Sequence, residues 1–289
     1  MSDITRVGVA GCGLMGSGIV EVCSRAGLDV VVREVDDGAA AAGRARIEGS
    51  LARGVRAGKL SAEDRDAALT RVRVTTALDD LADRELVIEA ATENPAVKAA
   101  LFAELDRVAE RPDVILATNT SSIPIVQVAQ ASTRPAQVVG VHFFNPVPVQ
   151  RLVEVIPSVL TAPQVVQRVT DLVTKALGKT VIKAPDRSGF VVNALLVPYL
   201  LSAIRMLEAG YATAEDIDLG MTLGCAHPMG PLRLSDLIGL DTLKAVADSM
   251  YEEYKEPLYA APPLLRRMTD AGLLGRKSGR GFYDYQDSR

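Results

Sequence analysis

The sequence predicts an α/β protein with a mostly parallel sheet, a helical hairpin that projects from the sheet, and an all-α C-terminal domain. Short apolar runs alternate with longer helical patterns over the first half of the chain, which is the rhythm of βαβ units. These runs are apolar almost throughout, as in a sheet that is covered on both faces. Beyond about residue 186 the strand signals nearly stop and helical patterns follow one another.

The first elements are a strand at RVGVAG, a helix to about Ala26 and a strand at DVVVREV. Helical segments then run to about Arg71. Within them Ser61 can cap a helix through its hydroxyl, with Asp64 following three residues later. We therefore expect a helical hairpin around GVRAGKLS that interrupts the βα alternation and projects from the sheet.

The alternation resumes at ELVIEAAT and continues with a helix over about 96–110, a strand at VILATNT and a short helix near Val126. Strands at VVGVHFF and LVEVI, a helix at APQVVQRVTDLVTKALG and a strand at TVIKAP follow. We place a domain boundary after these elements, so that residues 1–186 form the first domain and residues 187–289 a helical second domain.

The length, composition and charge of the chain limit the classes of protein to which it can belong. The chain has 289 residues, 48% of them hydrophobic, which suffices for two compact cores. Its net charge of -4 comes from 32 basic and 36 acidic residues without a run of like charge, so nucleic acid is not an expected partner. The charge-free segment over residues 189–204 includes Asn193 and Pro198 and is shorter than the roughly 18 residues of a membrane span. A buried helix is expected there.

The N-terminal residues and the cysteines suggest a location. The start, MSDITRVGVAG, lacks a charged segment followed by a long apolar core, so no secretion signal is expected. Cys12, Cys23 and Cys225 show no CxxC spacing and are odd in number, which argues against a disulfide framework and against a zinc site. We therefore expect a reduced, cytoplasmic protein without a metal.

The pattern GCGLMG at residues 11–16 follows a strand directly and opens a helix. Its first glycine permits a tight turn, its second lets a pyrophosphate approach the backbone, and its third permits close helix packing, while the helix N-terminus offers amide donors. Glu34 ends the second strand, where an acid can accept hydrogen bonds from an adenosine ribose. This context predicts a Rossmann-type dinucleotide site. Its expected contacts are Gly11, Gly13, Leu14, Met15, Gly16 and Glu34.

Each part of this site has a simpler interpretation. The glycines can serve turn chemistry alone, and Glu34 can be a solvated strand end. An acid at that position repels a 2′-phosphate and so favours NAD, but the neighbouring Arg33 weakens this preference and leaves NADP open.

His142, one of only two histidines, ends an apolar run, and Glu154 follows twelve residues later among apolar neighbours. Imidazole titrates in the range needed to exchange a proton with an alcohol as hydride leaves its carbon. If the two segments are neighbouring strands, Glu154 can fix the ring tautomer and stabilise the imidazolium. Otherwise His142 is a core histidine and Glu154 a surface carboxylate. The second histidine, His227, lies between turn residues, which indicates a packing or loop role.

Seven motifs, in order and across nearly the whole chain, resemble those of the 3-hydroxyacyl-CoA dehydrogenases, with the closest likeness to the short monofunctional 3-hydroxybutyryl-CoA dehydrogenases. They are GCGLMGSG, ATEN…K, ATNTSSIPI, VHFFNPVPVQRLVEVI, DRSGFVVNALL, HPMGPLRLSDLIGLD and GRKSGRGFYDY. The HFFNP motif followed by the glutamate of LVEVI is far more specific than a glycine fingerprint. Glu34 departs from the aspartate of many relatives, and Ala194 from a basic residue.

The resemblance implies a catalytic pair of His142 and Glu154, with Ser121 and Asn193 hydrogen-bonding the substrate. It also places four residues against the nicotinamide half of the cofactor, namely Glu93, Lys98, Ser121 and Asn145. From sequence alone, Ser121 can instead cap the next helix, Asn193 satisfy buried backbone, and Asn145 shape the turn before a proline.

The resemblance further implies the interconversion of (S)-3-hydroxyacyl-CoA, above all 3-hydroxybutyryl-CoA, and 3-ketoacyl-CoA by hydride exchange with NAD. It implies a homodimer formed through the helical domain. Two alternatives remain open at this point. One is a dehydrogenase of a free hydroxy or sugar acid, and the other is a dinucleotide-binding protein that has lost turnover.

Overall fold

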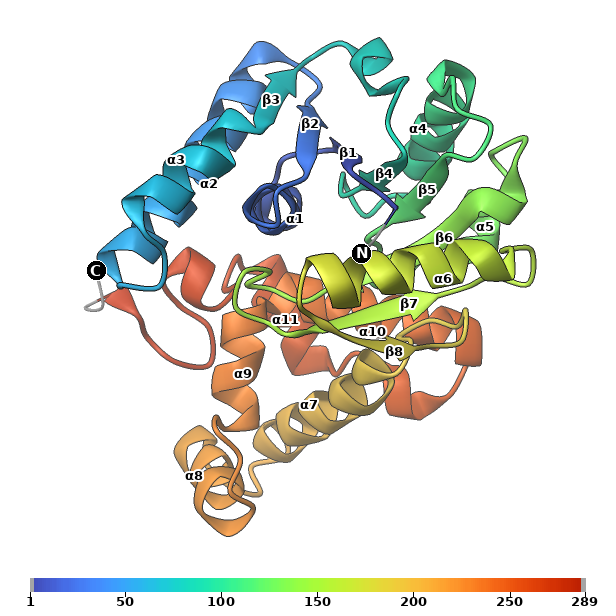
Figure 1. The fold of residues 1–289 in the computed structure, drawn as a ribbon. Coiled ribbons are helices and arrows are strands. Elements are labelled where there is room, and N and C mark those ends of the chain that lie inside the picture. Colours follow the sequence, from blue (N-terminus) through green and yellow to red (C-terminus); the bar gives the residue numbers. More distant parts are fainter. Residues whose placement is uncertain (1–2, 287–289) are drawn as a thin grey trace. The chain divides into compact units, whose positions relative to one another are not determined.

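The computed structural model describes residues 3–286. The chain divides into two compact units, Met1–Asp186 and Arg187–Arg289. The first contains a large sheet with its helices, and the second is built from helices, with isolated β-bridges near its end (Figure 1). The predicted fold, a mostly parallel sheet followed by a helical region, is confirmed.

An eight-stranded sheet forms the centre of the first unit, in the order β3-β2-β1-β4-β5-β6-β7-β8. Neighbouring strands from β3 to β6 pair in parallel, β7 runs antiparallel to β6, and β8 is again parallel to β7. The strands are β1 (Arg6–Ala10), β2 (Asp29–Arg33), β3 (Val72–Thr75), β4 (Leu86–Glu89), β5 (Ile115–Thr118), β6 (Val138–Phe143), β7 (Leu152–Ile156) and β8 (Thr180–Lys183).

Helices connect these strands. They are α1 (Leu14–Arg25), α2 (Asp37–Arg56), α3 (Ala62–Thr70), α4 (Pro95–Val108), α5 (Ile125–Ala129) and α6 (Pro163–Asp171), with short helical turns η1 (Leu78–Leu81), η2 (Pro135–Gln137) and the π-helical η3 (Leu172–Ala176). Helix α5 begins without a side-chain cap of its own. The carboxylate of Asp186 accepts from its first two amides, those of Ile125 and Val126.

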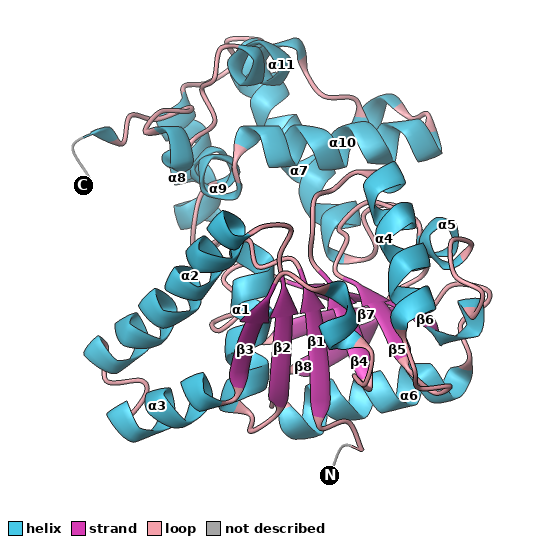
Figure 2. Cartoon of the chain, turned by 90° about the horizontal axis from the view of Figure 1, so that it is seen from above, coloured by secondary structure: helices cyan, strands magenta, loops and turns pink. Residues whose placement is uncertain are grey.

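The predicted hairpin consists of α2 and α3, which extend beyond the β3 edge of the sheet (Figure 2). Both helices begin at a capping side chain. The Asp36 carboxylate accepts from the amide of Ala39, and the Ser61 hydroxyl accepts from the amide of Asp64 at 2.9 Å. The cap that the sequence indicated at Ser61 is therefore present.

Alternate residues of a strand point to opposite faces of the sheet. Val141 of β6 belongs to a buried cluster with residues of α1, α2 and α6. Gly140, one position earlier, faces the other way, since a Cβ atom there would lie 2.7 Å from Ile125 of α5. His142 and Glu154 share the α5 face with Gly140. This side of the sheet carries the imidazole and the carboxylate described below.

The second unit contains α7 (Val192–Glu208), α8 (Ala214–Gly224), α9 (Pro231–Ile238), α10 (Leu240–Tyr254) and α11 (Pro263–Asp270), with η4 (Pro257–Tyr259) and η5 (Arg276–Ser278). Leu200, Leu201 and Ile204 of α7 are fully buried in its core, whereas Leu195 on the opposite face is 75% exposed. The expectation of a buried helix therefore holds for one face only. Among the described helices none is both long and apolar enough to span a bilayer.

Strand β3 was missing from the sequence-based prediction, which passed from the hairpin directly to ELVIEAAT. Its four residues are Val72–Thr75, and none of them is fully buried. An edge strand with alternating polar residues gives a weaker signal than the continuous apolar runs of the central strands. Strand β2 also ends at Arg33, so Glu34 lies just beyond the strand.

Candidate active site

The glycine-rich turn between β1 and α1 is shaped by close backbone contacts. Gly11 has φ +100°, and a Cβ atom there would lie 2.8 Å from the carbonyl oxygen of Ala90. A Cβ atom at Gly16 would lie 1.9 Å from the carbonyl oxygen of Gly11. At Gly13, by contrast, no described protein atom lies within 4 Å of the Cβ position. The protein's own packing therefore requires the first and third glycines but not the second.

The N-terminus of α1 begins at Leu14 with Gly13 as a cap that has no side chain. The amides of the first helical turn, including those of Leu14 and Met15, therefore receive no acceptor from the capping residue. Such a turn is suited to bind an anion through its amides and the helix dipole. This geometry fits a dinucleotide pyrophosphate, in agreement with the predicted cradle.

The Glu34 carboxylate is hydrogen-bonded to this turn. One of its carboxylate oxygens accepts from the amide of Cys12 and the other from the amide of Val35 at 3.2 Å. It is therefore not a solvated strand end. Burial and the Glu34 charge raise the pKa of the Cys12 thiol to about 12, so this cysteine stays protonated and unreactive. The Arg33 guanidinium donates to the carbonyl oxygen of Thr76 at 3.3 Å.

His142 and Glu154 are partners in the sheet. The antiparallel register of β6 and β7 sets them directly opposite each other, on neighbouring strands that Figure 1 shows side by side. His142 Nδ1 lies 2.8 Å from Glu154 Oε2, and both residues are buried. The imidazole and the Phe144 ring pack in a T-shaped arrangement, with centroids 4.6 Å apart. The pairing that the sequence offered as one of two interpretations is the one in the structure.

A turn of polar residues follows β5. The Glu93 Oε1 atom accepts from the Ser121 amide at 3.0 Å, the Ser122 amide at 3.2 Å and the Ser122 hydroxyl at 3.0 Å, and also from the Thr120 hydroxyl. Glu93 thus holds the turn that carries Ser121. Helix α5 takes its cap from Asp186, so Ser121 does not cap it.

Glu93 is predominantly ionised at neutral pH. Burial acts to raise the pKa of its carboxyl, but the Lys98 charge and the hydrogen bonds from Thr120, Ser121 and Ser122 outweigh burial and hold the pKa below its usual range. Lys98 Nζ lies 3.3 Å from Glu93 Oε2.

Lys98 has a second and closer partner that sequence reasoning missed. Its Nζ atom lies 2.7 and 2.8 Å from the two carboxylate oxygens of Glu89, which also accept from the Thr118 hydroxyl and the Ala91 amide at 2.7 Å. A signal was present in ELVIEAAT, since a carboxylate that ends a continuous apolar strand requires a buried partner.

Two further polar residues lie near the ends of β5 and β6. Asn119, which the sequence did not single out, accepts from the amide of Phe143 through its side-chain oxygen at 2.9 Å and so fixes the strand next to His142. The exposed Asn145 precedes Pro146 through a cis peptide bond.

Two residues considered from the sequence lie in the second unit. Asn193 is partly buried in the first turn of α7. The exposed His227 follows α8, and its Nδ1 atom lies 3.2 Å from the hydroxyl oxygen of Tyr199. The structure thus places His227 in a loop, beside a tyrosine.

Comparisons with known proteins cover the whole architecture. A model of the 3-hydroxyacyl-CoA dehydrogenase NAD-binding domain matches residues 6–187, and a model of the C-terminal domain of the same enzymes matches residues 189–285. A 3-hydroxybutyryl-CoA dehydrogenase of Mycobacterium tuberculosis is 59% identical over 286 residues, covering 99% of this chain and 100% of the relative. The human mitochondrial hydroxyacyl-coenzyme A dehydrogenase is 41% identical, covering 98% of this chain and 92% of the relative.

Solved structures agree. The crystal structure of FadB2 from M. tuberculosis, 59% identical, superimposes with a TM-score of 0.97 and covers 98% of this chain and 99% of that one. The (S)-3-hydroxybutyryl-CoA dehydrogenase PaaH1 from Ralstonia eutropha, 44% identical, gives a TM-score of 0.92 with the same coverage. The chain therefore belongs to the 3-hydroxyacyl-CoA dehydrogenase family, and its first unit contains that family's NAD-binding domain.

Proposed function

We propose that the protein interconverts (S)-3-hydroxybutyryl-CoA and acetoacetyl-CoA, with His142 as the group that moves the proton. The observation that carries this proposal is the buried contact of 2.8 Å between His142 Nδ1 and Glu154 Oε2. Relatives with 44% and 59% identity that bear the name of this activity support the choice of substrate.

The glycine-rich turn and Glu34 would hold NAD. The first-turn amides of α1 would bind the pyrophosphate, and Glu34 would turn from the Cys12 amide to the ribose hydroxyls. When bound, NAD accepts a hydride from C3 of the substrate, and NADH returns it. We propose NAD as the preferred form, because Glu34 would repel a 2′-phosphate and Arg33 is engaged with a backbone carbonyl.

Glu154 sets the proton chemistry of His142. An ionised carboxylate against Nδ1 keeps the proton on that nitrogen, so that Nε2 is the atom that takes the hydroxyl proton during oxidation. In reduction the imidazolium donates from Nε2 to the forming alkoxide, and the Glu154 charge stabilises the imidazolium until the proton has moved.

Further residues would place the reacting oxygen and the nicotinamide. We propose that the Ser121 hydroxyl and the Asn193 amide hydrogen-bond the substrate oxygen, which is the role that the family resemblance implies. Glu93 would fix the position of Ser121 through its backbone amide. Asn145 would lie on the nicotinamide side, and the exposed Arg53, Arg56 and Lys59 of the hairpin are available to coenzyme A phosphates.

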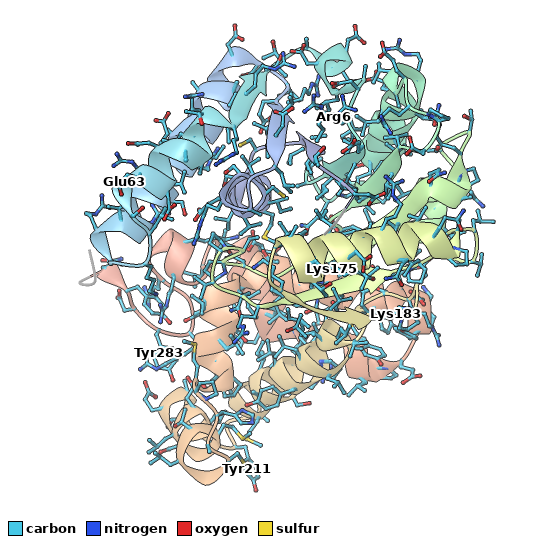
Figure 3. The ribbon with its side chains drawn as sticks, in the orientation of Figure 1. Arg6, Glu63, Lys175, Lys183, Tyr211 and Tyr283 are labelled. Carbon is cyan, nitrogen blue, oxygen red and sulfur yellow. The ribbon has the colours of Figure 1, made fainter. Side chains whose placement is uncertain are left out.

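The helical unit would form a homodimer. It exposes large apolar side chains, of which Leu195 is 75%, Leu219 55% and Leu223 77% exposed, and a hollow of about 600 Å³ lies beside Leu195. Tyr211, labelled in Figure 3, lies between α7 and α8 and is 81% exposed. Charged replacements at Leu195 or Leu223 should yield monomers in sedimentation experiments, whereas Val159→Asp, at an apolar residue 90% exposed in the first unit, should leave the dimer intact.

The three cysteines are free, with Cys12 and Cys23 buried and Cys225 exposed. Burial raises the pKa of the Cys23 thiol to about 12. Free thiols suit a reducing compartment, and we propose that the protein works in the cytoplasm.

The test is reduction of acetoacetyl-CoA, followed by nicotinamide absorbance with NADH and with NADPH, for the native chain and for His142→Ala. Consumption of NADH by the native chain, lowered by about 10³-fold in the variant with NADH affinity retained, is the expected result. Activity on acetoacetate but not on its coenzyme A ester would instead assign a free-acid substrate. Binding of NADH without turnover of either compound would indicate a dinucleotide-binding protein.

A further inference from the structure

The loop between β6 and β7 folds into a tight turn. The carbonyl oxygen of Pro146 accepts from the amides of Val149 and Gln150, both at 2.9 Å. Val147 is 2% exposed and packs on α1, where a Cβ atom at Gly18 would lie 2.8 Å from the Val147 Cβ atom. Helix α1 therefore supports one side of the turn.

Lys179 holds the other side of this turn, which spans residues 146–150. Its ammonium donates to the carbonyl oxygens of Val147 at 2.7 Å and Gln150 at 2.6 Å. The backbone of the lysine is itself fixed, because its amide donates to the carbonyl oxygen of Val173 in η3 at 3.0 Å and β8 begins at the next residue. Strand β8 borders β7 at the edge of the sheet (Figure 1). The ammonium thus links the turn to a fixed part of the sheet.

Charge attraction does not explain the position of this ammonium. Among the described residues Lys179 has hydrogen bonds to two carbonyl oxygens but no ion pair. Burial and the nearby Arg25 charge lower the pKa of the ammonium below its usual range. The surroundings therefore disfavour a cation, and what the lysine contributes is its pair of hydrogen bonds to the turn.

We propose that Lys179 is a positioning residue, which closes the turn over residues 146–150 and thereby holds Asn145 against the nicotinamide. Asn145 directly precedes the turn, so a shift of the turn would displace its side chain. Lys179 acts only through the backbone of the turn and touches no reacting group. The inference deepens the proposed function, because it rests on the place given there to Asn145.

The test compares the binding of NADH with that of ADP-ribose, which carries the pyrophosphate and the adenosine but lacks the nicotinamide. Lys179→Met removes both hydrogen bonds to the turn. We expect the dissociation constant of NADH to rise about tenfold and that of ADP-ribose to change by less than about twofold, since only the nicotinamide half loses a contact. Titration calorimetry measures both. A displaced nicotinamide should also lower kcat for acetoacetyl-CoA reduction about tenfold, with KM for acetoacetyl-CoA nearly unchanged.

A double-mutant cycle tests whether Lys179 acts through Asn145. Asn145→Ala should itself weaken NADH binding, and the addition of Lys179→Met should weaken it no further, because the contact that the lysine positions is already gone. Additive losses would overturn the proposal. So would equal losses of NADH and ADP-ribose affinity in Lys179→Met, which would indicate a general loosening of the unit.

Two further variants are compared by amide hydrogen exchange. Lys179→Met should accelerate exchange at the amides of Val149 and Gln150, whereas Lys179→Arg keeps a cation with several donors and should restore their protection together with NADH affinity. Restored protection without restored affinity would contradict the positioning role. Lys175→Met removes an exposed lysine of η3, labelled in Figure 3, which lies 3.0 Å from Asp171. This control should change neither quantity.

The proposed function and the role of Lys179 can fail separately. The binding and exchange measurements do not use acetoacetyl-CoA, so a chain that does not reduce this compound loses its proposed substrate, while NADH binding still decides the role of Lys179. Native NADH affinity and native exchange at the turn in Lys179→Met would remove that role, even in an enzyme that is fully active on acetoacetyl-CoA.

Discussion

Two carboxylates are buried in the sheet of the first unit and two in the helices of the second, and the two units compensate these charges differently. In the sheet of the first unit each carboxylate meets a base, because Glu89 meets the Lys98 amine and Glu154 meets the His142 imidazole. Glu89 is the last residue of β4, whereas His142 and Glu154 face each other across β6 and β7. The charge of each carboxylate–base pair depends on whether the base is protonated, so these pairs are suited to proton transfer.

In the helices of the second unit the carboxylates meet neutral donors. Asp236 accepts from the amides of Phe282 and Tyr283 and from the Tyr285 hydroxyl, while Asp218 accepts from the Tyr283 hydroxyl and from first-turn amides of α9. Within the described residues neither has an ion pair within 4 Å. These carboxylates bind the last segment of the chain to α8 and α9.

A buried carboxylate is therefore not by itself a sign of a catalytic site. What distinguishes the two kinds is the partner. A carboxylate whose partner is a base can exchange protons or stabilise a neighbouring charge. A carboxylate whose partners are amides and phenols serves as a structural contact between segments. Replacing one buried carboxylate of each unit by the amide of the same size should therefore lower turnover in the first unit and stability in the second.

Glu154→Gln should have the largest effect of these replacements. The amide keeps the size of the side chain but removes the charge that stabilises the imidazolium and fixes its tautomer. We expect kcat for acetoacetyl-CoA reduction to fall by about 10²-fold or more, with the melting temperature changed by only a few degrees. Steady-state kinetics and calorimetry on the same preparation measure both. A variant that keeps native kcat would remove Glu154 from the mechanism.

Asp236→Asn should instead lower stability and leave turnover nearly unchanged. An amide has one acceptor oxygen for three donors, so at least one buried donor loses its partner, at a cost of about 2–3 kcal/mol in the free energy of unfolding. Denaturant titration measures this loss, and kcat of the folded fraction should remain within about twofold of the native value. A large loss of kcat with native stability would contradict the assignment of Asp236 as a structural contact.

The pH dependence of stability tests the same contrast. Burial, assisted by the nearby Asp218 charge, raises the pKa of the Asp236 carboxyl above its usual range. The folded state therefore holds this proton to higher pH than the unfolded state does, so the contribution of Asp236 to stability is lost as pH rises from the ordinary carboxyl pKa through the raised one. The stability difference between the native chain and Asp236→Asn should shrink over that interval. Urea titrations at several pH values measure it, and a difference independent of pH would show that Asp236 titrates normally.

Sequence alone predicted much of the first unit, because its strands are continuous apolar runs and its motifs are local. The cradle over residues 11–16 and the hairpin cap at Ser61 depend on neighbours within a few positions. The pairing of His142 with Glu154 could also be anticipated, since two strands joined by a short loop tend to lie together. The register that sets them opposite each other, however, needed the sheet.

Several interactions missed from the sequence join segments that are distant along the chain. Glu89 and Thr118 meet because β4 and β5 are neighbours, and Asp186 reaches the start of α5 from beyond β8. No local pattern encodes such a partner. A polar residue at the end of an apolar strand indicates only that some partner exists, as Glu89 does.

Helix caps provide the smallest and most general comparison between the two units. Ser61 caps α3 through the Asp64 amide, and Thr213 caps α8 through the Asp216 amide at 3.1 Å. Both use a neutral hydroxyl at an exposed helix start, so replacement by alanine should cost about 1 kcal/mol in either unit and leave kcat unchanged. Thermal unfolding of the two variants measures this. If Thr213→Ala lowers the free energy of unfolding far more than Ser61→Ala does, exposed helix ends contribute more to the stability of the second unit than to that of the first. The two units would then differ at their surfaces as well as in their buried carboxylates.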